Sequence, residues 1–457
     1  MSTFTVTNPA TEEVLALIEG DNQQSIQEKY ELAKKGQPVW AEVPLTERIS
    51  CIRRFDQALG EQIERLAGIL SDEVGKPIQQ ARNEINGARG RIAFFLNNSE
   101  KWLQDEWMVL DGATKERISY EPLGIIANIS AWNYPYLVGV NVFIPALIGG
   151  NAVLYKPSEF ASLTGLAITD LLYQSGIPEN VFLTVLGGGM VGSYLLDLPL
   201  NGYYFTGSNR TGKIIASKVA EKMVPCQLEL GGKDPLYVTD EVADINQVAG
   251  AALEGVVYNN GQSCCAVERI YVHEKVYDEF LKSFTEQAKA LKIGNPKEEG
   301  IDIGPLTRKE QLAFILDQIQ DAQNKGAELV TGGYRLQQPG YYMMPAVLSN
   351  VNHSMRVMQE ESFGPVIGIQ KVSSDAEAID LMKDTSYGLT AAVYTSNEQR
   401  AEEILRKMNT GTVYWNCCDR VSANLPWSGR KHSGLGSTLS YTGIRAFVQP
   451  KAWHLRK

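Results

Sequence analysis

The stretch that decides the fold is residues 122–156, PLGIIANISAWNYPYLVGVNVFIPALIGGNAVLYK, which carries no charged side chain before Lys156. Its length alone would allow a membrane span. Four asparagines, a Gly-Gly pair and the prolines at 135 and 145 argue against a lipid-facing segment, which must satisfy its backbone internally. The pattern instead predicts a buried strand, a loop, a helix that runs to Ile148 and a second buried strand inside a globular core.

The sequence on both sides of this stretch predicts the layers of the fold. Residues 23–103 place apolar side chains at intervals of three and four, which predicts a helical opening layer. From residue 123, short apolar strands alternate with helical runs, and a second alternating region follows LELGG at 228–232 and continues to about residue 425. This rhythm is typical of right-handed strand-helix-strand units, so we expect an α/β fold with two parallel-sheet lobes.

Two segments fall outside both lobes. Residues 117–122, RISYEP, resemble an isolated strand, and the last twenty residues resume an alternation of β-branched and aromatic side chains. Strands that are far apart in sequence can pair and extend from the body, which is a common way to build a symmetric interface. The sequence therefore predicts an oligomer.

Composition limits the partners and the compartment. The 457 residues hold 43 Lys and Arg against 53 Asp and Glu, a net charge of −10. This balance disfavours nucleic acid and anionic membranes and favours small molecules or copies of the same chain. Six cysteines, four of them in two adjacent pairs, are too few for a disulfide scaffold, and the N-terminal sequence resembles no targeting segment. We expect a cytoplasmic protein.

Two glycine loops are candidate phosphate sites. Residues 186–192, LGGGMVG, have dinucleotide-loop spacing, but no acidic residue follows at the distance where a ribose would be held. Residues 205–214, FTGSNRTGKI, have phosphate-loop spacing but carry Ile214 where a Mg²⁺ ligand is needed, which disfavours nucleotide hydrolysis. The interpretation that remains for this loop is a strand that ends in a turn at Ser208, followed by a helix whose free N–H groups can face a pyrophosphate.

Several polar residues are candidates for chemistry. Glu229 lies in LELGGKDP, and about thirty residues later Cys264 and Cys265 lie in the polar loop YNNGQSCCAVER. Most free cysteines are small buried hydrophobes, but a polar, glycine-marked loop favours a nucleophile. Asn133 follows the first buried strand, where an asparagine is usually a cap or turn residue. Lys156 follows the second strand, where a salt bridge to a nearby carboxylate is the plain alternative.

Eight motifs together resemble one family. In order they are WN at 132–133, KPSE at 156–159, FTGS at 205–208, LELGGK at 228–233, NNGQSC at 259–264, EESFGPV at 360–366, NTGTVYWN at 409–416 and PWSGRKHSG at 426–434. Their order and spacing resemble the NAD(P)-dependent aldehyde dehydrogenase superfamily from about residue 8 to the C-terminus. The resemblance implies a Rossmann-like NAD(P)-binding domain of residues 1–103 and 123–228. It also implies a catalytic domain of 229–425, and bridging or oligomerisation strands at 104–122 and 438–457.

The resemblance also implies a mechanism. Cys264 would add to the aldehyde carbon, because a thiolate is nucleophilic near neutral pH. The side-chain amide of Asn133 and the backbone N–H of Cys264 would stabilise the oxyanion, where one such donor is worth ~3 to 4 kcal/mol. After hydride loss to the nicotinamide, Glu229 would act as general base on the water that hydrolyses the thioester.

On the cofactor side, the resemblance assigns Lys156 and Glu159 to the adenosine ribose, and Ser208 with the helix after Gly207 to the pyrophosphate. It assigns Glu361 to the nicotinamide ribose and Phe363 to a wall against the nicotinamide. Glu159 favours NAD, because a carboxylate pairs with a free 2′-OH and repels a 2′-phosphate, although NADP is accommodated if Glu159 swings away. The full predicted cofactor set is Trp132, Lys156, Glu159, Gly207, Ser208, Gly231, Glu361 and Phe363, and no metal is expected.

Two departures from the family pattern concern the substrate side. Cys265 directly follows the expected nucleophile, and the motif spacing selects Cys264; oxidation could couple the two thiols. Trp427 and Ser428 replace the more usual Phe-Gly, so the shape of the substrate funnel can differ. Arg420 is a candidate for binding the carboxylate of a semialdehyde such as succinate semialdehyde, with a surface arginine as the alternative.

Other functions stay open at this point. Coenzyme A-acylating relatives generally lack the glutamate of LELGGK, so Glu229 favours water as the acceptor. A non-catalytic structural or binding protein on the same fold is a second alternative, and thiol-dependent ester hydrolysis without cofactor, as a side activity of the same cysteine, is a third. We expect a small aldehyde as substrate and a homodimer or homotetramer, without nucleic acid or membrane partners.

Overall fold

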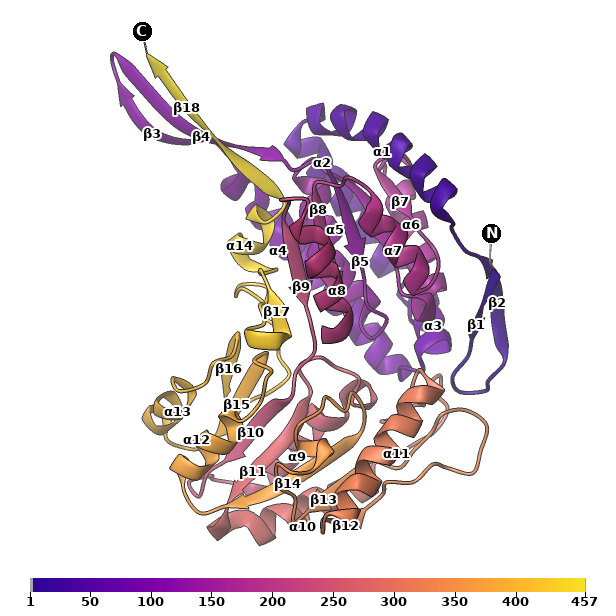
Figure 1. Cartoon of the computed structure of the whole chain (residues 1–457), viewed down its shortest axis with the longest axis vertical. Coiled ribbons are helices and arrows are strands. Elements are labelled where there is room, and N and C mark those ends of the chain that lie inside the picture. The colour runs from indigo at the N-terminus through magenta and orange to yellow at the C-terminus, as the bar shows by residue number, and fades with distance from the viewer. Residues whose placement is uncertain (1–2, 457) are drawn as a thin grey trace.

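The computed structural model describes residues 3–456, so the expected domain ends at residues 1, 2 and 457 lie outside the described residues. The chain forms one six-stranded sheet, one seven-stranded sheet and two small antiparallel sheets. Figure 1 shows the two large sheets in separate halves of the molecule, each flanked by its own helices. The predicted α/β class with two largely parallel sheets is therefore confirmed.

The opening layer is helical, as predicted. Asn22 caps the first helix by accepting a hydrogen bond from the backbone N–H of Ser25. Gly75 ends the third helix in the left-handed conformation, with φ of 76°, which a glycine adopts without steric cost. The four helices are α1 (Gln23–Glu42), α2 (Leu45–Glu61), α3 (Ile63–Val74) and α4 (Ile78–Leu103).

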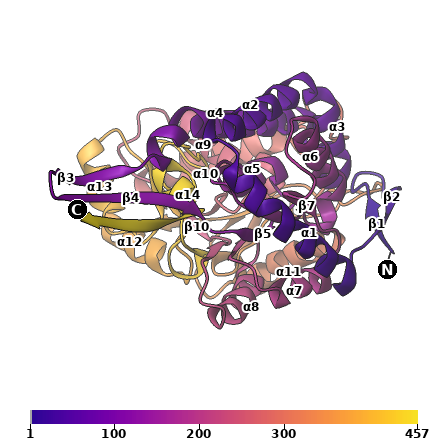
Figure 2. The ribbon, with the colours of Figure 1, turned by 90° about the horizontal axis from the view of Figure 1, so that it is seen from above.

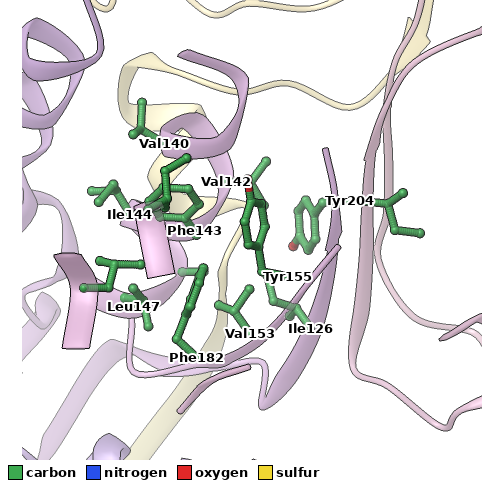
Figure 3. Close-up of a cluster of buried hydrophobic side chains, with 14 of the residues drawn as sticks. Ile126, Val140, Val142, Phe143, Ile144, Leu147, Val153, Tyr155, Phe182 and Tyr204 are labelled. Atoms are coloured by element: carbon green, nitrogen blue, oxygen red, sulfur yellow. The ribbon is translucent and has the colours of Figure 1, made fainter. Parts of the chain in front are cut away.

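The uncharged stretch 122–156 forms the predicted strand, loop, helix and strand. These elements are β5 (Ile125–Ile129), α5 (Pro135–Ile148) and β6 (Ala152–Lys156), and every residue of both strands is buried. Figure 3 shows Phe143 of α5 packed among the side chains of the sheet, with ring centroids 5.8 Å from Tyr155 and 5.5 Å from Phe182. Within residues 3–456, no helix is long and apolar enough to cross a membrane.

The six-stranded sheet has the order β17-β9-β8-β5-β6-β7. Its strands are parallel except β17, which runs antiparallel to β9 and comes from the C-terminal part of the chain. The further elements are β7 (Phe182–Thr184), β8 (Gly202–Thr206), β9 (Cys226–Glu229), β17 (Gly434–Leu435), α6 (Ser162–Gln174), α7 (Gly189–Asp197), α8 (Asn209–Ala220) and the 3₁₀ helix η1 (Glu159–Ala161). The edge strand β17 was not predicted, because two residues are too few for an alternating pattern.

The seven-stranded sheet has the order β12-β13-β14-β11-β10-β15-β16 and is parallel except for β12. Its strands are β10 (Asp234–Val238), β11 (Val267–His273), β12 (Glu328–Thr331), β13 (Ala346–Ser349), β14 (Val366–Val372), β15 (Thr390–Tyr394) and β16 (Thr412–Trp415). Its helices are α9 (Ile245–Val257), η2 (Tyr258–Gly261), α10 (Glu274–Ala290), α11 (Lys309–Asn324), η3 (Arg356–Met358), α12 (Asp375–Lys383), α13 (Glu398–Leu405) and η4 (Lys431–Ser433). Only residues 230–233 separate β9 from β10, so the two sheets meet directly at this loop.

A three-stranded antiparallel sheet leaves the body of the molecule. It is formed by β3 (Glu106–Asp111), β4 (Thr114–Pro122) and β18 (Val448–Arg456), in the order β18-β4-β3. Figure 2 shows it as an arm that projects from the body. A second small sheet is the hairpin of β1 (Thr3–Thr7) and β2 (Val14–Glu19), which was not predicted.

The expectation of strand from residue 438 onward is wrong for residues 440–445, which form helix α14 (Ser440–Arg445). The reason is burial: Leu439, Ile444 and Phe447 are all fully buried. Leu439 and Phe447 flank the two ends of α14 and Ile444 lies within it; on an alternating strand, Ile444 would face away from the other two. Asn151 then fixes this segment, because its side-chain amide donates to the carbonyl of Phe447 at 2.8 Å.

Candidate active site

The loop that carries Cys264 is held in an unusual backbone conformation. Asn259, Asn260 and Gly261 have φ angles of 52°, 58° and 70°, three consecutive left-handed residues. Asparagine and glycine tolerate this region best. The side chain of Asn260 is buried and anchors the turn, because it donates to the carbonyl of Pro305 at 2.6 Å and accepts from the N–H of Gly304 at 2.9 Å. Cys264 follows this turn and is partly buried.

The structure brings Asn133 to the cysteine loop. The side-chain amide of Asn133 donates to the carbonyl of Gln262 at 3.1 Å, two residues before Cys264. The backbone carbonyl of Asn133 accepts from the side-chain amide of Asn259 at 3.1 Å and from Nζ of Lys76 at 2.8 Å. The strand end after β5 and the cysteine loop are therefore tied together by buried hydrogen bonds.

Sequence reasoning missed the ion pair behind Asn133. Lys76 donates to the carboxylate of Glu84 on α4, and both side chains are fully buried. The other carboxylate oxygen of Glu84 accepts from the N–H of Tyr136 at 2.9 Å, in the first turn of α5. Helical periodicity gave no reason to single out these two charges within a polar, amphipathic stretch.

Glu229 ends β9 and lies against the same loop. A Cβ on Gly232 would lie 2.8 Å from the carbonyl oxygen of Cys264, so the loop after Glu229 passes directly beside the cysteine. The carboxylate of Glu229 is buried and accepts a hydrogen bond from the hydroxyl of Thr438. Burial raises the pKa of Glu229 to about 7, while the Thr438 hydroxyl and the charge of Arg91 act to lower it. A carboxyl group with this pKa suits general base chemistry near neutral pH.

Trp427 acts on this site through its backbone. Its N–H donates to the carbonyl of Thr438 at 2.8 Å, and the N–H of Thr438 donates back at 2.9 Å. The indole ring is buried in the core of the first half, and Cys264 is among the partly buried residues packed against that core. Thr438, which holds Glu229, was missed by sequence reasoning because a threonine in a Gly-Ser-rich segment gives no signal of its own.

The two adjacent thiols have different surroundings. Cys265 is buried, and its thiol donates to the carboxylate of Asp419 at 2.9 Å. Ser263 donates to the same carboxylate oxygen at 3.3 Å. The hydrogen bond with Cys264, burial and the charge of Asp419 raise the pKa of Cys265 well above its ordinary value. Cys265 is thus held as a neutral thiol, and Cys264 is the less buried of the two residues.

The predicted adenosine side of the cofactor site is formed at the carboxyl end of β6. Nζ of Lys156 lies 4.0 Å from the carboxylate of Glu159. A Cβ on Gly188 would lie 3.5 Å from that carboxylate, and one on Gly192 would lie 3.8 Å from Cε of Lys156. The glycine loop 186–192 and the KPSE motif therefore lie side by side.

The predicted pyrophosphate site is the start of α8. Ser208 caps this helix by accepting from the N–H of Thr211 at 3.3 Å. Gly207 precedes it, where a Cβ would lie 2.5 Å from the ring of Phe205. The free N–H groups of the first turn follow the carboxyl end of β8, next to β5 in the sheet.

The residues predicted for the nicotinamide side come from both halves of the molecule. The carboxylate of Glu361 accepts a hydrogen bond from the N–H of Gly232 at 3.2 Å. It also covers Gly231, because a Cβ on Gly231 would lie 2.1 Å from the carboxylate oxygens of Glu361. Burial and the neighbouring charge of Glu268 raise the pKa of Glu361 to about 8. The rings of Phe363 and Trp132 meet edge to face, with centroids 5.6 Å apart.

These groups fit a dinucleotide. Glu159 and Glu361 offer acceptors for ribose hydroxyls, the start of α8 offers N–H donors for a pyrophosphate, and the two aromatic rings offer a wall. Within residues 3–456, no group of three or more His, Cys, Asp or Glu side chains is arranged to hold a metal.

Two arginines differ from expectation. The side chain of Arg420 is 64% exposed and pairs with Glu254 at 3.3 Å, so the structure does not bring it to Cys264. Its role in substrate binding stays a prediction. Arg91 on α4, which sequence reasoning missed, is partly buried and donates to the carbonyl of Leu137 at 3.0 Å and to the side chain of Asn141 at 3.1 Å.

Comparisons with known proteins agree with the motifs. A family model described as "Aldehyde dehydrogenase family" matches residues 1–453. The chain is 33% identical to the peroxisomal aminoaldehyde dehydrogenase 1 of Malus domestica, over 98% of this chain and 91% of that protein. It is 32% identical to the NADP(+) succinate-semialdehyde dehydrogenase of Deinococcus radiodurans, over 98% and 94%. The structure of betaine aldehyde dehydrogenase from Staphylococcus aureus in complex with NAD+ is similar with a TM-score of 0.95 and 28% identity, covering 99% of this chain and 92% of that chain.

Proposed function

The chain belongs to the aldehyde dehydrogenase family, and on that premise we propose which of its residues oxidise an aldehyde to a carboxylic acid. It is an NAD(P)-dependent enzyme of this family. The observation that carries the proposal is the meeting of three segments at one cysteine: the loop after β5 with Asn133, the end of β9 with Glu229, and the turn that presents Cys264.

Cys264 is the nucleophile in this proposal. Its sulfur adds to the carbonyl carbon, and the carbonyl oxygen takes up the negative charge. The amide of Asn133 lies beside the cysteine loop and donates a hydrogen bond to that oxygen, together with the N–H of Cys264. NAD(P), when bound, supplies the hydride acceptor, and a thioester on Cys264 remains. Cys265 takes no part in the reaction, because its thiol already donates a hydrogen bond to the carboxylate of Asp419.

Glu229 is the general base of the second half of the reaction. Its carboxylate removes a proton from water, the resulting hydroxide attacks the thioester carbon, and the thiolate of Cys264 leaves. A pKa of about 7 means that near neutral pH about half of the Glu229 side chains are ionised and able to accept this proton. This residue supports water and not coenzyme A as the acyl acceptor.

We infer that NAD is the preferred cofactor. Glu159 lies beside the glycine loop 186–192, where its carboxylate accepts from a free 2′-hydroxyl and repels a 2′-phosphate. Lys156 lies 4.0 Å away and partly offsets this repulsion, which limits the discrimination against NADP.

We also infer a homo-oligomer built through the projecting arm. β3 and β18 are the two edges of its sheet, and both present exposed apolar side chains: Trp107, Met108, Leu110 and Leu455. Unpaired edges with apolar side chains favour pairing with another copy.

The six free cysteines are consistent with a reducing compartment such as the cytoplasm. Recovery of the protein from an oxidising compartment by cell fractionation would contradict this localisation.

The first test concerns the nucleophile. We expect Cys264→Ser to lower aldehyde oxidation by at least about 10³-fold, since a hydroxyl is a far weaker nucleophile than a thiolate. Reduced-cofactor absorbance with a panel of aldehydes is the measurement. Cys265→Ser is the matched control and keeps its activity, because a hydroxyl can still donate to Asp419. Full activity in Cys264→Ser would exclude the assignment, and strict dependence on coenzyme A would exclude water as the acceptor.

The second test concerns the cofactor. Measured side by side, kcat/KM is expected to be higher with NAD than with NADP. Glu159→Gln should narrow this ratio by about tenfold, because it removes the charge that repels the 2′-phosphate. Equal ratios in the wild-type enzyme and the variant would contradict the role of Glu159.

The third test concerns the pKa of Glu229. A base must be deprotonated, so kcat should fall as the pH drops below about 7. Thr438→Val removes a hydrogen bond that stabilises the carboxylate, so the acid limb of the profile should move to higher pH by about one unit. The matched control is Thr442→Val, which does not contact Glu229. An unmoved acid limb in Thr438→Val would show that Glu229 does not set it.

The fourth test concerns assembly. Replacing Met108 and Leu110 together by lysine should convert the oligomer to monomer, as measured by sedimentation equilibrium. The same double change at Val14 and Leu17, which are exposed on β2, is the control. Wild-type enzyme that sediments as a monomer, or an oligomer that survives the change in β3, would rule out the arm as the interface.

A further inference from the structure

One face of α4 lines the boundary with α5 near the reacting cysteine. Glu84, Ala88, Arg91 and Phe95 recur at helical spacing, and all but Arg91 are fully or almost fully buried. The two helices approach closely, because a Cβ on Gly87 would lie 3.2 Å from the side chain of Leu137. Glu84 accepts from the N–H of Tyr136 in the first turn of α5, and Arg91, about 10 Å further along α4, donates to Leu137 and Asn141 in the first and second turns.

The guanidinium of Arg91 has unused donors. Nη1 makes both of its hydrogen bonds, to the carbonyl of Leu137 and to the side-chain oxygen of Asn141. These are neutral acceptors. In the part of the chain that the structure describes, no carboxylate lies within ion-pair distance of Arg91, and Nε and Nη2 have no hydrogen-bond partner. Neither atom is sealed from solvent, so both can reach a ligand.

This charge acts on the reaction centre. Burial lowers the pKa of Arg91, and the charges of Glu229, Cys265 and Cys264 work against that shift, so these groups share one electrostatic environment. An arginine stays protonated in proteins at all ordinary pH values. The helix that Arg91 bonds also begins two residues after Asn133, whose amide lies at the cysteine loop.

The other charges around this centre are already partnered. Glu84 is neutralised by Lys76, and the carboxylate of Asp419 accepts from Cys265 and Ser263. Glu229 accepts from Thr438, and with a pKa of about 7 it is only partly ionised at neutral pH. Arg91 is therefore the one charge on α4 near Cys264 without an opposite charge to pair with, among the residues described.

We propose that Arg91 binds an anionic group on the aldehyde, so that the substrates are aldehydes that carry a carboxylate at the end remote from the carbonyl. The planar guanidinium can donate from Nε and Nη2 to the two oxygens of one carboxylate. This inference rests on the proposed function of Cys264. It assigns the role to Arg91 and not to Arg420, whose exposed side chain already pairs with Glu254.

The proposal separates the chain from part of its own family. Its relatives include enzymes named for aminoaldehydes, whose substrates are cationic, and one named for succinate semialdehyde, whose substrate is anionic. A fixed positive charge beside the reacting sulfur attracts the second class and repels the first.

The kinetic experiment compares three aldehydes of equal chain length: succinic semialdehyde, butanal and 4-aminobutanal. In the wild-type enzyme, kcat/KM is expected to be highest for succinic semialdehyde and lowest for 4-aminobutanal. Arg91→Met should lower the ratio of succinic semialdehyde to butanal by about tenfold or more, mainly through KM, and Arg91→Lys should restore part of it. The matched control is Arg89→Met, which lies on the same helix but pairs with Asp56 at 3.1 Å.

A second readout needs neither cofactor nor turnover. Iodoacetate and iodoacetamide alkylate the same thiol with loss of iodide, but only iodoacetate carries a carboxylate. The rate ratio of iodoacetate to iodoacetamide at Cys264, followed by fragment mass spectrometry, should fall severalfold in Arg91→Met and stay at the wild-type value in Arg89→Met. Because it reports on the thiol alone, this ratio stays readable in a variant that turns over slowly.

The outcomes distinguish the two claims. If the wild-type enzyme oxidises no aldehyde through Cys264, the proposed function fails. If it oxidises aldehydes but Arg91→Met leaves both ratios unchanged, only the role of Arg91 is overturned. The role of Arg91 is also overturned if Arg420→Ala abolishes the preference for succinic semialdehyde while Arg91→Met keeps that preference.

Discussion

The rest of the site depends on the buried ion pair between Lys76 and Glu84. Removing one partner of such a pair leaves an uncompensated charge in the core, at a cost of about 3 to 5 kcal/mol, so the two residues are locked to each other. Lys76 also holds the carbonyl of Asn133, and Glu84 holds the first turn of α5. The opening helical layer thereby fixes the loop that carries Asn133, the proposed oxyanion donor, and that loop in turn is bonded to the turn that presents Cys264.

Two buried carboxyl groups, Glu229 and Glu361, adjoin the loop 230–233, which passes beside Cys264. Burial raises the pKa of Glu229 to about 7 and that of Glu361 to about 8, so each changes its charge close to neutral pH. Each is also held by one specific donor, the hydroxyl of Thr438 for Glu229 and the N–H of Gly232 for Glu361. The loop 230–233 lies between Glu229 and Glu361 and joins the two large sheets. A shift of one sheet relative to the other would therefore change the surroundings of both carboxyl groups.

The sequence predicted the architecture well because the stretch 122–156 admits few structures: an uncharged run interrupted by asparagines and prolines has to be buried in a sheet. It also placed Cys264, Glu229 and Asn133 in the segments that the structure brings together. It missed Lys76, Arg91 and Thr438, because each acts through a contact far away in sequence that no local pattern reveals. Helix α14 was missed because Leu439, Ile444 and Phe447 are unevenly spaced in the sequence. Apolar residues at such spacing show no clear helical period. Arg420 was selected from its place in the chain, and only the structure shows that its side chain points to Glu254.

The strand β17 and Thr438 come from the far end of the chain, yet they complete the first sheet and hold the carboxylate of Glu229. During translation, the edge of β9 that pairs with β17 therefore has no partner strand while some two hundred residues are synthesised. The nascent polypeptide can form the first strands and helices early, but the hydroxyl that holds the carboxylate of Glu229 arrives only when the last segment emerges. An incomplete product released by the ribosome would thus carry both Cys264 and Glu229, but it would lack the hydroxyl of Thr438 and the strand β17.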